Sequence, residues 1–190
     1  MYDGAFKDCM CDIESLGTKS GSVILSIGAV LFTADDGGRL GHEFYTVINT
    51  EDSIAAGLTC DTSTLEWWSK QSDEAKAVIR QAQTVEESQP IRAALLDFSA
   101  WLGEKSAFRL WGNGAAFDNA LIAAAYAKLE MTYPIAHWND MCYRTLKKSI
   151  SIANVAKPKL AHHALEDAKA QAINAITMIQ KLREYGEHQL

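Results

Sequence analysis

Prolines, cysteines and linker-like stretches are scarce in this sequence. Three prolines occur among 190 residues, and no run rich in proline, glycine or serine divides the chain. The four cysteines are Cys9, Cys11, Cys60 and Cys142. They form no CxxC pair and have no spacing typical of a zinc site, so we expect reduced, buried thiols. We expect a single domain over residues 1–184, followed by a short C-terminal tail over 185–190.

Long apolar runs and surplus positive charge are missing too. No apolar run approaches the roughly 20 residues of a membrane-spanning helix. The N-terminal residues 1–8 include acids and do not resemble a signal peptide, so we expect a cytoplasmic protein. The 18 basic and 24 acidic residues give a net charge of −6, which disfavours a generally basic surface for nucleic acid. The charged residues of the segment 144–159 are nevertheless all basic.

The order of the apolar patterns indicates a sheet covered by helices. Three strand-like runs come first, at 6–14, 23–32 and 43–48, and their short connections favour antiparallel pairing. Two more strands are expected near 107–111 and 135–138. Helical patterns are expected at 62–69, 73–82, 86–103, 117–130, 140–150 and 164–184. This order predicts an α/β fold in which a central mixed five-stranded sheet is flanked by helices.

Two acids stand at the end of the first expected strand. Asp12 and Glu14 are two residues apart and therefore share a face of the strand, while Cys9 and Cys11 would lie on the opposite face. Adjacent carboxylates repel each other unless a positive charge lies between them, and a bound cation would supply that charge. The alternative is a pair of acids that simply face water at a strand end.

Two further segments place an acid at the start of a helix. Asp118 follows the Gly-Asn-Gly turn at 112–114, which lacks the Lys-Ser/Thr of a P-loop and leaves room for the close approach of a ligand. Asp167 lies near the first turn of the last helix, five residues after His162. Each acid alone could be a helix cap, and the histidine alone could be solvated.

Together the three segments offer four carboxylates and one histidine. Hydrolysis of a phosphodiester with two divalent cations needs several carboxylates at one point and a proton acceptor. A histidine, whose ordinary pKa is about 6.5, suits the second task at neutral pH. We therefore expect two Mg²⁺ or Mn²⁺ ions beside His162, bound by Asp12, Glu14, Asp118 and Asp167.

The order D-x-E, D and H-x-x-x-x-D resembles the DEDD 3′→5′ exonucleases. Their histidine-bearing branch, DEDDh, places His five residues before the last Asp, as His162 does. The tyrosine branch places Tyr four residues before it, a position held here by His163. The blocks 12–18 and 162–167 are close to the family form. The run 64–71 is similar to a subgroup with exodeoxyribonuclease VIII nuclease domains, phage exonuclease A and related bacterial exoribonucleases.

The resemblance implies both a fold and an activity. It implies a ribonuclease H-like fold and a metal-dependent 3′→5′ exonuclease that releases 5′-mononucleotides from DNA or RNA, in a bacterial cell or a phage-infected host. It also implies contacts of Ser15, Leu16 and Gly17 with the 3′ end of the substrate, with Leu16 wedged against the terminal base. A homodimer is a further suggestion of the resemblance.

Other residues are candidates for substrate contact. Trp67 and Trp68 would point about 100° apart on a helix, so one would pack against the sheet while the other could stack on a base or lie at an interface. Asn113 lies in the turn that leaves room for a ligand. The basic segment could bind the nucleic-acid backbone or could simply be solvated. Its lysines are Lys147, Lys148, Lys157 and Lys159.

Three other functions fit part of the pattern. They are a ribonuclease H-like endonuclease with the same metals, a non-catalytic nucleic-acid-binding module, and an acidic cation-binding or scaffold protein. A substrate with a blocked 3′ end separates the two nucleases, because only endonuclease cutting survives the block. Magnesium-dependent phosphodiesterase activity would exclude the other two.

Overall fold

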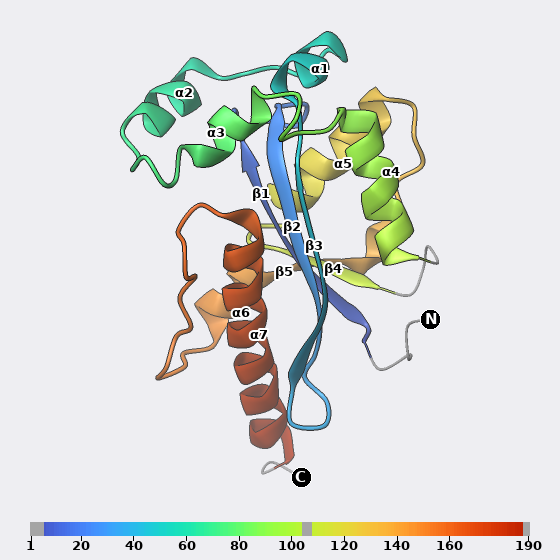
Figure 1. The fold of residues 1–190 in the computed structure, drawn as a ribbon. Helices are drawn as coiled ribbons and strands as arrows, with labels where there is room; N and C mark the ends of the chain where they lie inside the picture. Colours follow the sequence, from blue (N-terminus) through green and yellow to red (C-terminus); the bar gives the residue numbers. More distant parts are fainter. Residues whose placement is uncertain (1–5, 104–107, 188–190) are drawn as a thin grey trace.

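The centre of the molecule is a mixed five-stranded sheet. A computed structural model describes residues 6–103 and 108–187, and the strand order is β3-β2-β1-β4-β5 (Figure 1). The strands are β1 (Asp8–Ser15), β2 (Ile24–Thr33), β3 (Arg39–Val47), β4 (Arg109–Gly112) and β5 (Asp140–Cys142). The first three pair antiparallel, whereas β4 pairs parallel with both β1 and β5. This sheet confirms the predicted fold class.

Helices cover both faces of the sheet. The two longest are α4 (Ile91–Leu102) on one face and α7 (Ala164–Glu187) on the other (Figure 1). The remaining helices are α1 (Thr50–Ala55), α2 (Thr62–Ser69), α3 (Ala77–Ala82), α5 (Asp118–Lys128) and α6 (Tyr143–Ser149). In the view of Figure 1, α1 and α2 lie at the upper end of the sheet, α3 lies beside the upper part of the strands, and α5 lies on the side of α4. No helix within the described ranges has both the length and the apolar content to cross a membrane.

Alternate side chains of β1 enter two separate cores. Cys9 and Cys11 are buried in the core shared with α4 and α5, and the cysteines are free thiols. Met10 is buried in the opposite core, with residues of α7. Because Asp12 and Glu14 continue the face of Met10, both acids point to the side of the sheet on which α7 begins. The alternation predicted from the sequence is confirmed.

The predicted strand at 135–138 is wrong. Residues His137–Asn139 form a single 3₁₀ turn, and the strand that pairs with β4 is β5, at Asp140–Cys142. The apolar residue Ile135 fills the core instead of joining the sheet. Pairing begins only at Asp140, whose carboxylate accepts a hydrogen bond from Asn119 Nδ2 over 2.8 Å.

Helix boundaries differ from the predicted ones where proline or capping residues act. α4 begins at Ile91 and not at 86, because a residue before proline avoids the helical conformation and Pro90 precedes the helix. The backbone N–H of Ile91 donates to the Asp52 carboxylate at 2.8 Å, which caps the new start. α3 likewise begins at Ala77 and not at 73.

Two further differences concern α1 and α7. The pattern did not predict α1, which Asn49 initiates by accepting a hydrogen bond from the backbone N–H of Asp52 at 3.0 Å. α7 continues to Glu187, three residues into the stretch expected as a tail. Residues 188–190 lie outside the described part of the chain.

Candidate active site

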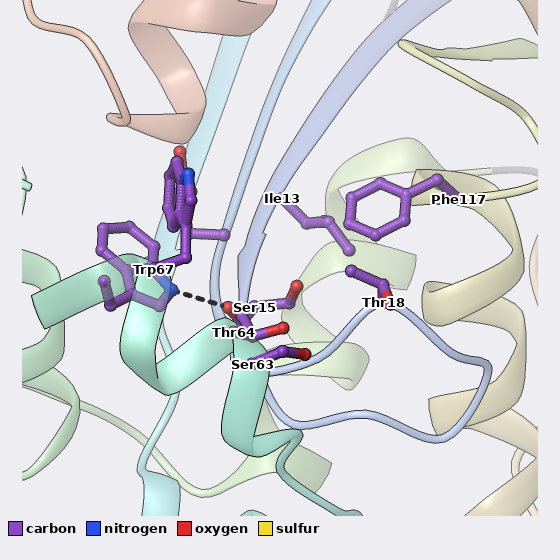
Figure 2. Close-up of a pocket in the computed structure, with 9 residues that line it drawn as sticks. Ile13, Ser15, Thr18, Ser63, Thr64, Trp67 and Phe117 are labelled. Atoms are coloured by element: carbon purple, nitrogen blue, oxygen red, sulfur yellow. Dashed lines mark hydrogen bonds between the residues drawn. The ribbon is translucent and has the colours of Figure 1, made fainter. Parts of the chain in front are cut away.

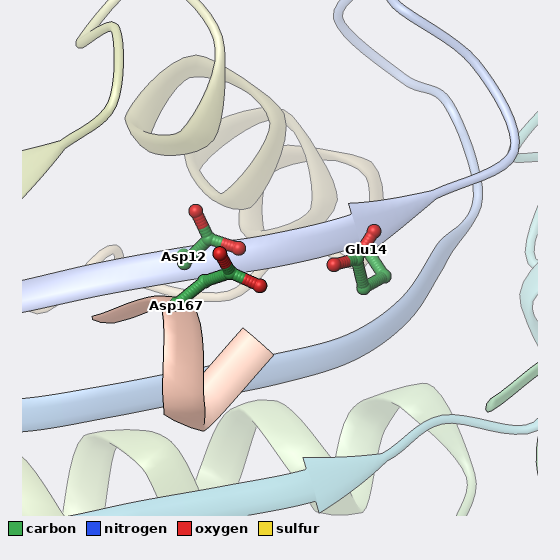
Figure 3. Close-up of side chains that lie close together, drawn as sticks. All are labelled: Asp12, Glu14 and Asp167. Carbon is green, nitrogen blue, oxygen red and sulfur yellow. The ribbon is translucent and has the colours of Figure 1, made fainter. Parts of the chain in front are cut away.

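Three carboxylates from two distant segments meet beside the sheet. Asp12 and Glu14 stand near the end of β1, and Asp167 stands in the first turn of α7. One oxygen from each side chain lies within 4.8 Å of the other two, and Figure 3 shows the three groups facing a common space. The end of the central strand β1 and the start of α7 therefore bring together acids that are about 150 residues apart in the chain.

Asp118 approaches the same place from β4 and α5. It is the first residue of α5 and is only 2% exposed. A Cβ atom on Gly112 would lie 2.9 Å from the Cβ atom of Asp118 and 2.4 Å from Asn119 Oδ1, so glycine permits this close approach. The four acids border one cavity of about 250 Å³, which we call the acidic cavity. Its lining residues are Asp12, Ile13, Glu14, Asn113, Phe117, Asp118, Arg144, His162, Asp167 and Gln171.

Burial and mutual repulsion favour the protonated form of these acids. Burial, followed by repulsion from Asp167 and Asp118, raises the pKa of Glu14 to about 8. Burial raises the pKa of Asp118 to about 7, although backbone N–H groups and the charge of Arg144 oppose the shift. Desolvation and the charges of Asp118 and Glu14 raise the pKa of Asp12 well above its usual range. The cluster is therefore an unfavourable concentration of negative charge in the absence of a cation.

The two adjacent histidines have different surroundings. His162 lines the acidic cavity, and its ring contacts those of Trp67 and Trp68 edge-on, with centroid distances of 5.1 and 6.0 Å. Its φ of 61° lies in the left-handed region, which turns the chain sharply before α7. His163 stacks instead on Tyr45 at 4.4 Å. Of the two histidines, only His162 lines the acidic cavity.

The polar residue Gln171 of the acidic cavity was not among the candidates from the sequence. Gln171 is 8% exposed, and its Nε2 donates a hydrogen bond to Asp12 Oδ1 over 2.7 Å. It lies four residues after Asp167, one helical turn further on the same face, and this spacing is the signal that could have identified it. Arg144 donates to the backbone carbonyl of Asn113 and brings a positive charge to the rim.

A second, largely apolar cavity adjoins the acidic one. It has a volume of about 420 Å³ and lies between the end of β1 and α2 (Figure 2). Its lining residues, which define the aromatic cavity, are Ile13, Glu14, Ser15, Thr18, Ser63, Thr64, Trp67, Trp68 and Phe117. Trp68 is 2% exposed and its Nε1 donates to the Ser15 carbonyl over 2.9 Å, whereas Trp67 is 43% exposed. Trp68 is thus buried and hydrogen-bonded, whereas the side chain of Trp67 is partly exposed. The helical spacing of the two residues predicted this difference in burial.

The segment 15–17 is only partly available to a ligand. Ser15 lines the aromatic cavity, and its hydroxyl donates to the Gly17 carbonyl over 2.7 Å. Leu16 is 4% exposed and packs into the core, and its backbone N–H donates to the Val23 carbonyl at 2.9 Å. The role of Leu16 as a wedge against a terminal base stays a prediction. Gly17 is in close contact with Ser22, where an added Cβ atom would lie 2.3 Å from the hydroxyl oxygen.

A third cavity, of about 230 Å³, lies on the other side of the acidic one. We call it the basic cavity. Its lining residues are Asn113, Tyr143, Lys147, Val155, Ala156, Lys157, Pro158, Asp167, Ala170, Gln171 and Asn174. Of the four lysines considered from the sequence, Lys147 and Lys157 belong to this lining, whereas Lys148 and Lys159 do not.

The donor set of the acidic cavity fits divalent cations. Carboxylate oxygens are the ligands that Mg²⁺ and Mn²⁺ take in proteins. Among the described residues, Asp118 Oδ2 and Asp167 Oδ2 are buried without a hydrogen-bond partner, so each has an oxygen left to bind a cation. A mixed five-stranded sheet that carries such a cluster, a neighbouring histidine and adjoining cavities is the arrangement of a metal-dependent nuclease of the ribonuclease H-like fold.

Comparisons with known proteins identify the family. Residues 7–179 match the model of the 3′-5′ exoribonuclease Rv2179c-like domain, and the chain belongs to this family. It is accordingly a metal-dependent 3′→5′ exonuclease that acts on nucleic acid. A search of curated proteins finds no match.

Two solved structures are similar to this chain. The nuclease domain of 3′hExo, a DEDDh family member bound to rAMP, superposes with a TM-score of 0.54 at 14% sequence identity, over 92% of both chains. Cell-death related nuclease 4 (CRN-4) has a TM-score of 0.47 at 10% identity, over 97% of this chain and 67% of the other. The first of these likenesses agrees with the ribonuclease H-like fold predicted from the sequence.

Proposed function

We propose that this chain trims RNA from the 3′ end with Mg²⁺, and that the acidic cavity is its catalytic centre. The observation that carries the proposal is the convergence of acids from β1, α5 and α7 beside His162. In this proposal two cations are held by Asp12, Glu14, Asp118 and Asp167. When bound, they would lower the pKa of the attacking water and offset charge on the attacking and leaving oxygens.

His162 is proposed to accept the proton of the attacking water. Its ring lines the acidic cavity while its edge contacts with Trp67 and Trp68 restrict its orientation. The water oxygen forms a bond to phosphorus, and the bond from phosphorus to the 3′ oxygen of the preceding nucleotide breaks. That oxygen takes up a proton, and the released product is a 5′-mononucleotide. A positioned histidine contributes typically about 10²–10⁴-fold to such a step.

The aromatic cavity is proposed to hold the terminal nucleoside. It shares Glu14 and Phe117 with the acidic cavity, so a nucleoside bound there would lie next to the scissile phosphate. Trp67 is exposed and offers its indole ring to a base. Stacking of a base on an aromatic ring contributes roughly 1–3 kcal/mol and does not depend on the base sequence. Ser15, Thr18 and Thr64 supply hydroxyl groups that can contact the sugar.

RNA is the substrate class that the family description supports. The matching family is described as an exoribonuclease domain, and the similar structure of 3′hExo was determined with rAMP. Discrimination between RNA and DNA depends on contacts to the 2′-hydroxyl, and the hydroxyl groups of the aromatic cavity are the groups proposed to make them.

The experiment compares four single-stranded oligomers of one sequence. They are RNA, DNA, DNA with a single 3′-terminal ribonucleotide, and RNA with a blocked 3′ end, each labelled at the 5′ end and incubated with Mg²⁺. The proposal expects stepwise shortening of RNA, slower loss of DNA, faster removal of the single ribonucleotide than of a terminal deoxyribonucleotide, and no cutting of blocked RNA. Equal rates on RNA and DNA would contradict the RNA preference. Internal cuts in blocked RNA would favour an endonuclease.

A further inference from the structure

The aromatic, acidic and basic cavities adjoin one another in that order. The aromatic cavity shares Ile13, Glu14 and Phe117 with the acidic cavity. The acidic cavity shares Asn113, Asp167 and Gln171 with the basic cavity. The aromatic and basic cavities have no lining residue in common. The acidic cavity therefore lies between an aromatic and a basic neighbour.

The basic cavity is lined by α6, α7 and the loop 155–158 between them. Tyr143 is 2%, Asn174 3% and Gln171 8% exposed, so the inner wall consists of buried polar and aromatic side chains. Lys147 on α6 and Lys157 on the following loop are exposed side chains at the opening. Because both are cations at neutral pH, the opening favours an anion of moderate size.

Side-chain hydrogen bonds hold the loop that completes this cavity. Asn174 Nδ2 donates to the Ala156 carbonyl at 3.0 Å, and the Ala156 N–H donates to Asn174 Oδ1 at 2.7 Å. Lys181 Nζ donates to the Ser151 carbonyl at 2.7 Å and attaches the same loop to α7 a second time. The loop backbone beside Lys157 is thus preformed, which lowers the entropy cost of binding a ligand there.

The polarity of the strand decides which phosphate such a site can take. A 3′→5′ exonuclease cuts the last internucleotide linkage, so the nucleotide on the 3′ side of the cut ends in a hydroxyl and carries no further phosphate. With the terminal nucleoside in the aromatic cavity and the scissile phosphate in the acidic cavity, the strand continues in the 5′ direction. The next anionic group along it is the second phosphate from the 3′ end.

We propose that the basic cavity binds this second phosphate through Lys147 and Lys157. The proposal rests on the proposed function and adds to it a substrate requirement: a minimal substrate gains affinity when it carries a phosphate one nucleotide 5′ of the scissile one. Asp167 lines both the basic and the acidic cavity, and the cations proposed for the acidic cavity would offset its negative charge. The two lysines bind ground state and transition state alike, so they act on KM and not on kcat.

Dinucleotides provide a direct test. A dinucleotide with a 5′-hydroxyl contains only the scissile phosphate, whereas the same dinucleotide with a 5′-phosphate contains both. We expect the 5′-phosphate to lower the KM of the wild-type protein by about tenfold or more, with kcat nearly unchanged, as for a charge-assisted hydrogen bond. In Lys147→Gln/Lys157→Gln the KM of the 5′-phosphorylated dinucleotide should rise to that of the 5′-hydroxyl form.

The chain offers a matched control from the same segment. Lys148→Gln/Lys159→Gln removes the same charge from two exposed lysines that do not line the basic cavity, so it should keep the effect of the 5′-phosphate. All four lysines are exposed, and melting temperatures of both variants check that folding is intact. Equal KM values for the two dinucleotides with the wild-type protein would overturn the proposal. So would an undiminished 5′-phosphate effect in Lys147→Gln/Lys157→Gln.

The same measurement separates this inference from the proposed preference for RNA. It is made with ribodinucleotides and with deoxyribodinucleotides. A preference for the deoxyribo series would contradict the RNA proposal, yet the 5′-phosphate effect and its loss in Lys147→Gln/Lys157→Gln would still be measurable in that series. A preference for the ribo series without any 5′-phosphate effect would leave the RNA proposal standing and overturn the second-phosphate site.

Discussion

At the scale of single residues, the active site is organised around carboxylates that repel one another. Burial raises the pKa of Asp12, Glu14, Asp118 and Asp167, and repulsion from neighbouring acids adds to the shift at Asp12 and Glu14. His162 opposes the shift at Asp167, and the Gln171 amide opposes it at Asp12. Such a cluster gains most from a ligand that carries several positive charges, which is the physical reason for proposing two divalent cations there.

Gln171 is expected to orient Asp12 for cation binding. Its hydrogen bond to Asp12 Oδ1 leaves the second carboxylate oxygen for a cation, and such outer partners typically contribute about 10–100-fold to metal affinity. Gln171→Leu should therefore weaken Mn²⁺ binding by about that factor in calorimetric titration of the protein treated with EDTA. Activity should recover partly at high Mn²⁺ concentration.

Gln180 provides the control for this measurement. It lies on the same helix and donates to the Ala34 carbonyl at 3.3 Å, outside the lining of the acidic cavity. Gln180→Leu should retain wild-type Mn²⁺ affinity even if its melting temperature falls. An Mn²⁺ affinity that is unchanged in Gln171→Leu would show that Asp12 needs no orienting partner.

Substitutions of His162 and His163 should have different effects on the kinetics. His162→Gln should lower kcat by about 10²–10⁴-fold at saturating RNA while Mn²⁺ affinity stays close to that of the wild type, because the ring is proposed to move a proton. His163→Gln removes a ring stacked on Tyr45 and should act mainly on the melting temperature. The reverse pattern would assign the proton acceptor to His163.

At the scale of secondary-structure elements, sequence patterns located the parts of the site that lie at element ends. β1 and β2 were predicted within two residues, because long apolar runs bounded by turns are strong signals. The acids at the end of β1 and at the starts of α5 and α7 line one cavity, since their positions follow from those elements. Contacts made by loops across the sheet have no such local signal.

Other features of the site could not be predicted, because they depend on contacts between segments and not on a local pattern. The resemblance implied a contact of Leu16 with the terminal base and gave no sign that its side chain would be buried in the core. Lys147 and Lys148 are adjacent and chemically identical in the sequence, and only the placement of α6 against α7 assigns the first to the basic cavity. The two hydrogen bonds between the Asn174 side chain and the Ala156 backbone join residues 18 positions apart. Ala156 lies in an irregular loop, so no periodic pattern in the sequence predicts these bonds.

The junction of β2 with α7 should control the position of Asp167. A Cβ atom on Gly28 would lie 2.1 Å from the backbone nitrogen of Leu165 and 2.2 Å from the carbonyl carbon of Ala164. Gly28→Ala should therefore push the start of α7 away from the sheet and cost about 1–3 kcal/mol of unfolding free energy. Activity measured well below the melting temperature should fall as well, because Asp167 moves with the helix.

Gly186 offers a control substitution at the other end of α7. Among the described residues, apart from its chain neighbours and the backbone of its own helix, none has an atom within 4 Å of a Cβ atom built there, so Gly186→Ala should be neutral or slightly stabilising. Denaturant unfolding of both variants, combined with their activity on RNA, tests the argument. A stable and fully active Gly28→Ala protein would show that α7 does not need this close approach.

At the scale of the whole molecule, net charge is less informative than its distribution. The chain carries −6 overall, yet the segment between Arg144 and Lys159 has no acid and borders both the acidic and basic cavities. Four of the acids line the acidic cavity itself. An acidic protein can thus present a locally basic path to a nucleic-acid strand.

The stability of the metal-free protein should decrease as pH rises. Glu14, whose pKa is raised from 4.5 to about 8, and Asp118, raised from 3.8 to about 7, bind more protons in the folded than in the unfolded state. Their stabilising contribution is complete below the unfolded pKa and is lost as pH rises through the folded pKa. In EDTA the melting temperature should therefore fall between about pH 5 and pH 8.

Mg²⁺ should reverse this trend, since it binds the deprotonated carboxylates and stabilises the folded state by mass action. Asp118→Asn removes one of the repelling charges, so in EDTA at pH 8 it should melt at a higher temperature than the wild type. A wild-type melting temperature that rises with pH in EDTA, or that does not respond to Mg²⁺, would contradict the assignment of the carboxylates.

The most direct measurement follows single-turnover cleavage of 5′-labelled single-stranded RNA by the wild type and by Asp118→Asn, each with Mg²⁺ and with EDTA. With Mg²⁺, the wild type should give a ladder that shortens one nucleotide at a time from the 3′ end and should release 5′-mononucleotides. Asp118→Asn should give no ladder, although its circular dichroism spectrum should match that of the folded wild type. The wild type in EDTA should give no ladder either. A wild-type ladder from the folded Asp118→Asn protein would contradict the placement of catalysis in the acidic cavity.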